Sequence, residues 1–161
     1  MTGGAPFRAA RPGDEAAVQQ VVFTVLREYG LVPEPDGVDV DLADLQGFYL
    51  RRGGAFLVVE DAAGAVAGCG GLLPVNDGDV ELRKMYLAKA LRGRGLGRAL
   101  LEVLIDEARA MGCRRVVLDT ASVLTEAIAL YRARGFQPLE RGPHVKRCDQ
   151  AFFLDLADGG R

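Results

Sequence analysis

The sequence has few of the residues on which several common kinds of site depend. Its 161 residues include one histidine, His144, so a site with several histidine ligands cannot be built. The cysteines, Cys69, Cys113 and Cys148, are odd in number, lie far apart and form no CxxC pair, which argues against a disulfide framework or a structural zinc site. No GxSxG turn is present to hold a serine nucleophile. We therefore expect neither a metal site nor a serine-hydrolase triad.

Strong net charge and long apolar segments are missing as well. The formal net charge is −2, so no overall basic field would attract nucleic acid or a membrane surface. No apolar run approaches the roughly 20 residues that span a bilayer. The first residues, MTGGAPFRAARPGDEAA, contain no apolar core of a secretory signal. We expect a cytoplasmic protein that binds neither nucleic acid nor membrane.

What the sequence does contain is a regular succession of strand-like and helix-like segments. Its length and ordinary composition predict one α/β domain over 1–161, with a frayed tail over 157–161. Strands are predicted over 6–10, 55–61, 65–75, 80–87, 114–120, 136–140 and 149–156, and helices over 11–30, 42–54, 95–111 and 124–135. This order is typical of a sheet with helices on both faces. Residues 80–120 form one βαβ unit, whose two strands should be parallel.

The most informative stretch is LRKMYLAKALRGRGLGRALLEVLIDEA, residues 82–108, where a strand-like run leads through a short loop into an amphipathic helix. Arginine and glycine alternate around the start of this helix, at Arg92, Gly93, Arg94, Gly95, Gly97 and Arg98. The first N–H groups of a helix have no intrahelical partner, and this end is partly positive. Glycines let a phosphate approach those donors, and arginines fork onto its oxygens. The loop therefore predicts a phosphate-binding site.

Other phosphate loops fit this stretch less well. A P-loop requires GK[ST] at the end of the loop, and that sequence is missing here. A dinucleotide fingerprint requires G-x-G-x-x-G in the first βαβ unit, whereas this run is G-x-G-x-G and lies more than half-way along the chain. A nicotinamide or flavin site is therefore disfavoured. The remaining structural alternative is a glycine-rich turn whose arginines are only solvated.

The pattern R-x-x-G-x-G, met by Arg92, Gly95 and Gly97, resembles the acyl-CoA-binding motif of the GNAT superfamily of N-acyltransferases. A second segment, AIALYRARGF (127–136), is similar to the family's helix and strand beside the thiol end of the cosubstrate. ELRKMYL and RCDQAFFLDL look like a branch that acts on small molecules. The resemblance implies a mixed, mostly antiparallel sheet with a central splayed parallel pair and helices on both faces.

The resemblance also implies where acetyl-CoA would bind. Backbone groups of the strand before the loop, at Met85, Tyr86 and Leu87, would hydrogen-bond the pantetheine arm. The loop amides from Arg92 to Arg98, including that of Leu96, would hold the diphosphate. Leu124 stands where many family members carry asparagine, so we do not expect a side-chain hydrogen bond to the arm from this position.

Acyl transfer to an amine requires a neutral nucleophile. An alkylammonium with a pKa near 10.4 costs about 4–5 kcal/mol to deprotonate at neutral pH, so a general base helps, and the leaving thiolate gains from a proton donor. The resemblance implies Tyr131 as this acid. Glu81, four residues before Met85 on the same strand, is the candidate base. Its alternative role is an ion pair with Arg83 or another basic neighbour.

The acceptor is the least defined part of the prediction. The acidic loop at Glu34, Asp36, Asp39 and Asp41 could attract a cationic amine or could simply be solvated. His144, Cys148 and Asp149 could line the same cleft, although Asp149 could equally stabilise a turn. We expect acetyl transfer from acetyl-CoA to the primary amine of a small molecule, by direct attack in a ternary complex of a monomer or homodimer. A non-catalytic acyl-CoA-binding module and a protein-lysine or N-terminal acetyltransferase remain alternatives.

Overall fold

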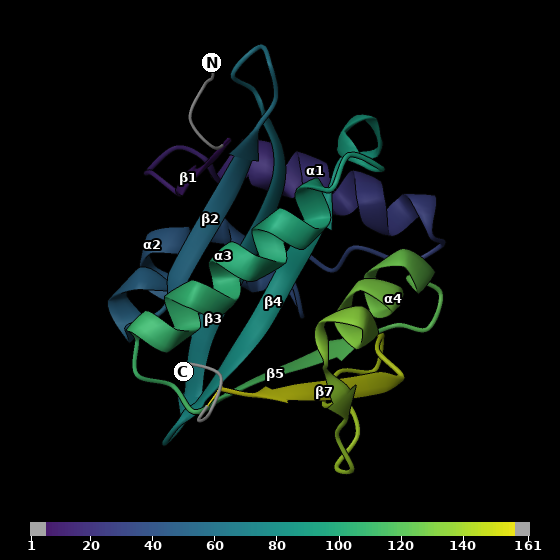
Figure 1. The fold of residues 1–161 in the computed structure, drawn as a ribbon. Coiled ribbons are helices and arrows are strands. Elements are labelled where there is room, and N and C mark those ends of the chain that lie inside the picture. The colour runs from purple at the N-terminus through teal and green to yellow at the C-terminus, as the bar shows by residue number, and fades with distance from the viewer. Residues whose placement is uncertain (1–5, 157–161) are drawn as a thin grey trace.

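A computed structural model describes residues 6–156 and contains one mixed sheet with helices on both faces (Figure 1). Its strands are β1 (Phe7–Ala9), β2 (Ala55–Glu60), β3 (Val66–Asn76), β4 (Asp79–Leu87), β5 (Arg115–Thr120), β6 (Gln137–Pro138) and β7 (Gln150–Asp155). They lie in the order β1-β2-β3-β4-β5-β7-β6, and every neighbouring pair is antiparallel except β4 and β5. The predicted fold class is confirmed. The predicted tail, 157–161, lies outside the described residues.

The helices form two layers. Helix α1 (Glu15–Glu28), helix α2 (Leu45–Phe48) and the 3₁₀ turns η1 (Val40–Ala43) and η2 (Leu50–Arg52) cover one face. Helices α3 (Leu96–Ala110) and α4 (Thr125–Arg134) cover the other, and η3 (Lys89–Leu91) precedes the glycine loop. No helix within residues 6–156 is both long and apolar enough to cross a membrane.

Two predicted elements differ in extent from the structure. The helix expected over 42–54 is broken because Asp44 is extended, with φ −151°, and its side chain accepts a hydrogen bond from the Gly47 amide (2.9 Å) at the start of α2. The strand expected over 136–140 pairs only at Gln137 and Pro138. Proline has no N–H to donate to a ladder, so it is confined to edge positions such as this one.

The central feature of the sheet is the separation of β4 from β5. Their ladder contains only three pairs, Asp79 with Arg115, Val80 with Val116 and Glu81 with Val117. Beyond these pairs β4 bonds only to β3, and β5 bonds only to β7. The closed end is fixed by the guanidinium of Arg115, which donates to both carboxylate oxygens of Asp79 (3.2 and 2.8 Å). This is the predicted splayed parallel pair.

A β-bulge at Lys84 changes which face the following residues occupy. The β3–β4 register steps from Gly71–Arg83 to Cys69–Tyr86, so β4 carries one extra residue, and Lys84 has a φ of +56°. Such a left-handed conformation is uncommon for a side chain of this kind. Leu82 and Met85 therefore share the α3 face, whereas Tyr86 packs on the α1 face.

Candidate active site

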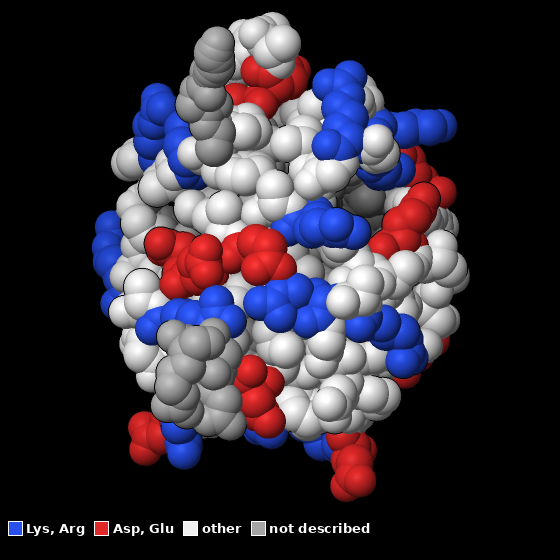
Figure 2. Space-filling view, viewed as in Figure 1, with Lys and Arg blue, Asp and Glu red and all other residues white. Residues whose placement is uncertain are grey.

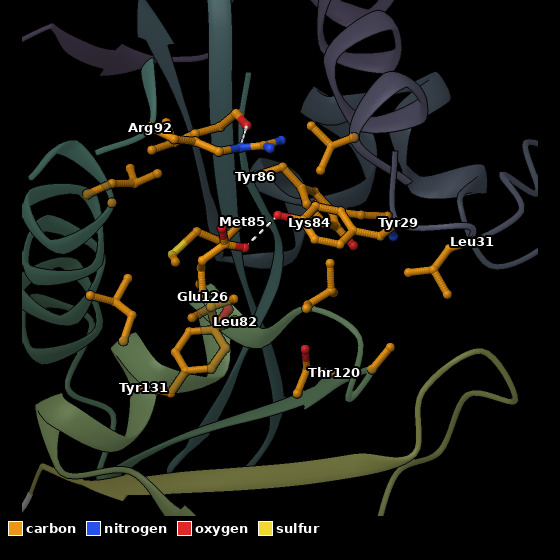
Figure 3. A pocket seen from close by; sticks show the side chains of 18 of the residues that line it. Tyr29, Leu31, Leu82, Lys84, Met85, Tyr86, Arg92, Thr120, Glu126 and Tyr131 are labelled. Atoms are coloured by element: carbon orange, nitrogen blue, oxygen red, sulfur yellow. Dashed lines mark hydrogen bonds between the residues drawn. The ribbon is translucent and has the colours of Figure 1, made fainter. Parts of the chain in front are cut away.

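A cavity of about 350 Å³ lies between the separated parts of β4 and β5 (Figure 3). One wall is β4 with the glycine loop, and the opposite wall is the end of β5 with α4. The end of α1 and the segment before β7 complete the lining. Of the predicted cosubstrate residues, Met85, Tyr86, Leu87, Arg92, Gly93 and Gly97 line the cavity. Arg94, Gly95, Leu96 and Arg98 lie on the same loop and first helical turn outside the lining.

The glycine loop leaves a run of backbone donors unused. The Arg92 amide donates to Lys89 O (3.2 Å), and the next amide with a main-chain acceptor is that of Ala99, which donates to Gly95 O (3.1 Å). Among the described residues, the six amides from 93 to 98 therefore have no main-chain partner, and no side chain caps α3. Gly93 and Gly95 have φ near +80°, so the turn itself requires glycine at these two positions.

The presence of glycine at position 97 has a different explanation. Its φ is not in the left-handed region, and an added Cβ would lie no closer than 3.5 Å to Leu130 and 3.7 Å to Leu87, which are ordinary contacts. Neither the backbone nor the packing of the protein therefore requires glycine here. Because Gly97 lines the cavity, the missing side chain instead leaves room for a ligand to reach the amides of the first turn. The loop therefore fits a diphosphate.

The side chain of Arg92 is occupied by protein groups. Its guanidinium donates to Leu87 O (3.0 Å) and to the carboxylate of Glu28 at the end of α1 (2.6 Å). Arg94 and Arg98 are exposed. In Figure 2 basic side chains gather over this loop, and a hollow opens beside them. The predicted contact from the Arg92 side chain to phosphate thus requires Glu28 to release it, whereas the amides are available directly.

Tyr131 lies on α4 and lines the cavity opposite Tyr86 and Lys84 (Figure 3). Its side chain is buried, and its ring packs against Phe136 with a centroid separation of 5.6 Å. Burial raises the pKa of the Tyr131 phenol above its usual value, so the hydroxyl is protonated at neutral pH. It has no hydrogen-bond partner among the described residues. A protonated, uncommitted hydroxyl facing a cavity is suited to donating a proton.

Glu81 does not line the cavity. Its carboxylate accepts a hydrogen bond from Arg83 (3.2 Å), which is the alternative considered from the sequence. The bulge at Lys84 lies between Glu81 and Met85 and inverts the alternation of side chains, so these two residues lie on opposite faces of the sheet. The acidic side chain therefore points to the α1 face, away from Tyr131.

The residues predicted for the acceptor are spread over several environments. Glu34, Asp36, His144 and Asp149 are exposed and do not line the cavity. The carboxylate of Asp149 accepts from both the amide and the hydroxyl of Ser122 (2.8 and 2.7 Å), so it stabilises a turn. Cys148 does line the cavity, and burial raises the pKa of its thiol to about 11, which keeps it neutral.

The other two acids of the loop, Asp39 and Asp41, are fully buried rather than solvated. Asp39 accepts two hydrogen bonds from Arg147 (2.8 Å each), and Asp41 accepts from Lys84 (3.1 Å). Burial alone would raise the pKa of the Asp39 carboxyl, but the hydrogen bonds from Arg147 and from the Glu34 amide, together with the charges of Lys84 and Arg147, outweigh burial, and the pKa lies below its usual value. Asp39 is therefore ionised, and both acids are paired with cations of the protein.

Sequence reasoning missed Lys84, Arg147 and Asp119, which all line the cavity. Asp119, the residue before the last of β5, accepts from Arg141 (3.2 Å) and from the His144 amide (2.8 Å), which orders the segment before β7. No periodic pattern marks these residues. A basic residue facing two acids more than 40 positions away can be recognised only in three dimensions.

The sequence of this chain is similar to those of known acetyltransferases. Residues 20–136 match the family described as "Acetyltransferase (GNAT) family". The uncharacterized N-acetyltransferase YjgM of Escherichia coli K12 is 39% identical over 132 residues, covering 79% of this chain and 78% of its own. The IAA acetyltransferase of Azospirillum brasilense is 38% identical over 129 residues, covering 79% and 80%. The chain belongs to the GNAT family.

Solved GNAT structures agree with this assignment. A GNAT-family acetyltransferase of Staphylococcus aureus Mu50 superposes with a TM-score of 0.87 over 93% of this chain and 98% of its own, at 18% identity. YncA of Salmonella typhimurium, solved with acetyl-CoA, superposes with a TM-score of 0.71 over 96% and 95%, at 28% identity. The protein is an acetyl-CoA-dependent acetyltransferase, as the resemblance of its glycine loop and of residues 127–136 implied. Within residues 6–156, no three His, Cys, Asp or Glu side chains are grouped to hold a metal ion.

Proposed function

We propose that this GNAT protein transfers an acetyl group from acetyl-CoA to the primary amine of a small molecule, by direct attack in a ternary complex. The observation that carries the proposal is the cavity between β4 and β5, with unused amides near one end and a buried phenol in its wall. The volume of about 350 Å³ suits a thioester arm with a small acceptor.

In the proposed complex, the amides from 93 to 98 bind the diphosphate, and backbone groups of Met85, Tyr86 and Leu87 bind the pantetheine arm where β5 has left the ladder. An anion at the N-terminus of a surface helix gains only about 0.3–1 kcal/mol from the helix dipole, so the affinity comes from several donors acting together. Leu124 and Leu130 provide apolar contacts to the arm from the α4 side of the cavity.

In the proposed reaction, the amine nitrogen forms a bond to the thioester carbonyl carbon and the carbon–sulfur bond breaks. The thiolate of coenzyme A takes a proton from the Tyr131 hydroxyl, and the product nitrogen loses one proton to solvent. Water resupplies the phenol. Burial keeps the Tyr131 hydroxyl protonated until negative charge develops on the leaving sulfur. Glu81 is placed outside this sequence, as a partner of Arg83.

The test is release of free coenzyme A when the purified protein is mixed with acetyl-CoA and a panel of small amines, with the N-acetyl product identified by mass spectrometry. Lysine-containing peptides and peptides with free N-termini form a second panel. Turnover confined to the peptides would replace the small-molecule assignment with a protein acetyltransferase. Binding of acetyl-CoA without turnover of either panel would favour a sensing module.

A further inference from the structure

The charged groups at the end of the cavity that Lys84 and Arg147 line are arranged in two layers. Lys84 and Arg147 line the cavity, whereas the carboxylates that neutralise them, Asp39 and Asp41, lie behind them and are not part of the lining. Both carboxylates have side chains with no exposed surface. A ligand at this end therefore meets cations first. This is the opposite of the acidic acceptor site that the sequence suggested.

Lys84 has no donor to spare. Its ammonium contacts Val38 O (3.3 Å), both oxygens of Asp41 (3.1 and 3.3 Å) and one oxygen of Asp39 (3.3 Å). Because an ammonium has three N–H donors, these acceptors satisfy it fully. Lys84 thus contributes positive charge to the wall and fixes the two acids, but it does not offer a hydrogen bond to a ligand.

Arg147 is only partly used. Nη1 donates to Val32 O (3.1 Å) and to Asp39 Oδ2 (2.8 Å), and Nη2 donates to Asp39 Oδ1 (2.8 Å). A guanidinium has five N–H donors in a fixed plane, so the N–H of Nε and the second N–H of Nη2 have no partner among the described residues. The Nε atom of Arg147 also has some accessible surface. Among the described residues, only Arg109 Nε is both fully buried and without a hydrogen-bond partner.

The two unused donors form the side-on edge of the guanidinium, and this edge matches the two oxygens of a carboxylate. Asp39 already holds the end-on edge, so Arg147 is fixed in place before any ligand arrives. A fixed arginine loses little conformational freedom on binding, which favours its use as a receptor. Among Lys84, Arg147, Asp39 and Asp41, two cations face two carboxylates, and the Arg83 guanidinium lies 3.7 Å from Asp41 as a third cation, so one more anion is tolerated.

We infer that the acceptor is an amino-carboxylate, meaning a small molecule that carries a carboxylate close to the amine that is acetylated. Its carboxylate binds the side-on edge of Arg147, and its amine faces the thioester near Tyr131. This inference rests on the proposed function and narrows its substrate class.

A polycationic acceptor fits the cavity less well. The lining contains two carboxylates, and both are engaged: Asp119 with Arg141 and the His144 amide, and Glu126 with the hydroxyl of Tyr29 (2.6 Å). A second ammonium would therefore have to break one of these contacts. It would also approach Lys84 and Arg147, which repel it.

The experiment compares acceptors that differ only in the carboxylate. Three matched sets are assayed with acetyl-CoA: leucine, leucinamide and 3-methylbutylamine; phenylalanine, phenylalaninamide and phenethylamine; and β-alanine, β-alaninamide and ethylamine. Spermidine serves as the polycation. In at least one set, kcat/KM for the carboxylate is expected to exceed both counterparts by about 10-fold to 100-fold, the range for a hydrogen bond to a charged group.

A variant series assigns this preference to Arg147. Arg147→Lys keeps a cation beside Asp39 but lacks the planar fork, so the carboxylate preference should fall at least 10-fold while the KM for acetyl-CoA is unchanged. Asp39→Asn combined with Arg147→Met removes the fork without leaving a buried carboxylate unpaired, and it serves if Arg147→Lys folds poorly. Arg51→Lys, on an exposed arginine outside the cavity, is the matched control and should leave the preference unchanged.

The possible outcomes separate the two proposals. If amides or decarboxylated amines are acetylated as fast as the carboxylates, or if spermidine is the better acceptor, the carboxylate site is overturned and small-molecule acetylation stands. An unchanged preference in Arg147→Lys also overturns it. If no small amine is acetylated while peptides are, the proposed function fails and the inference fails with it.

Discussion

Asp39 and Arg147 lie 108 positions apart in the chain and are joined by two hydrogen bonds of 2.8 Å. This pair connects the loop after α1 to the segment before β7, two pieces of chain that share no strand pairing. Because the Asp39 side chain has no exposed surface, the pair contributes to folding as well as to the shape of the cavity. Breaking a buried pair of this kind from one side is costly.

The stability of the protein should therefore depend on the ionisation of Asp39. Its folded-state pKa is depressed, so the stabilisation is present above the unfolded-state pKa, near 3.9, and is lost as pH falls through the folded-state pKa. We expect Asp39→Asn to lower the free energy of unfolding by about 1.5–3 kcal/mol at pH 7. Urea denaturation of the wild type and of Asp39→Asn at pH 7, 5, 4 and 3 should show that the difference in their free energies of unfolding narrows below about pH 4. Asp36→Asn, on an exposed neighbour, should behave as wild type.

Replacing Gly97 separates ligand binding from folding. Gly97→Ala adds a methyl group that the protein accommodates and that improves helix propensity, so stability should be unchanged or rise by up to about 1 kcal/mol. The same methyl group occupies ligand space, so calorimetry should show about 5-fold to 150-fold weaker coenzyme A binding, in line with the roughly 1–3 kcal/mol cost of overpacking. Gly37→Ala, outside the cavity, is the control. Unaltered affinity in Gly97→Ala would place the diphosphate elsewhere.

Tyr131→Phe tests the proton donor. The ring contact with Phe136 remains and the hydroxyl has no described partner, so the thermal midpoint and acetyl-CoA affinity should stay close to wild type. We expect kcat to fall about 100-fold, the lower end of general acid–base contributions. Tyr86→Phe is the comparator, because burial also raises the pKa of the Tyr86 phenol and this side chain lines the same cavity. A larger loss of kcat in Tyr86→Phe than in Tyr131→Phe would assign the proton-donor role to Tyr86.

Glu81→Gln tests the ion-pair assignment. With Glu81 bonded to Arg83 outside the lining, we expect kcat/KM to fall less than about 10-fold, short of the 100-fold typical of a lost general base. The pH profile of kcat/KM should keep its shape. A loss above 100-fold, together with the disappearance of an acidic limb from the profile, would restore Glu81 as the base.

The parts of the fold that the sequence predicts well are those with a local signal. Periodic apolar residues locate α1 and α3, and glycine and arginine at 92–98 mark the phosphate loop. The pattern fails in the short helices after α1. There Asp44 breaks the chain through a side-chain hydrogen bond that no helical periodicity reveals.

The charged wall of the cavity could not be predicted in the same way. The alternation of side chains along β4 indicates that Glu81 and Met85 share a face, and only the register with β3 shows the extra residue at Lys84. The acidic loop suggested an exposed anionic surface. Its two innermost acids are instead neutralised by Lys84 and Arg147, whose positions depend on a bulge and on a long connection.

The separation of β4 from β5 has a consequence for how this enzyme can diversify. In the proposed complex, main-chain groups of Met85, Tyr86 and Leu87 bind the pantetheine arm. A substitution leaves the peptide C=O in place, and it removes the peptide N–H only when proline is introduced. The side chains at these positions can therefore vary while the cosubstrate is retained. New acceptors can be reached by changing the side chains around a fixed arm.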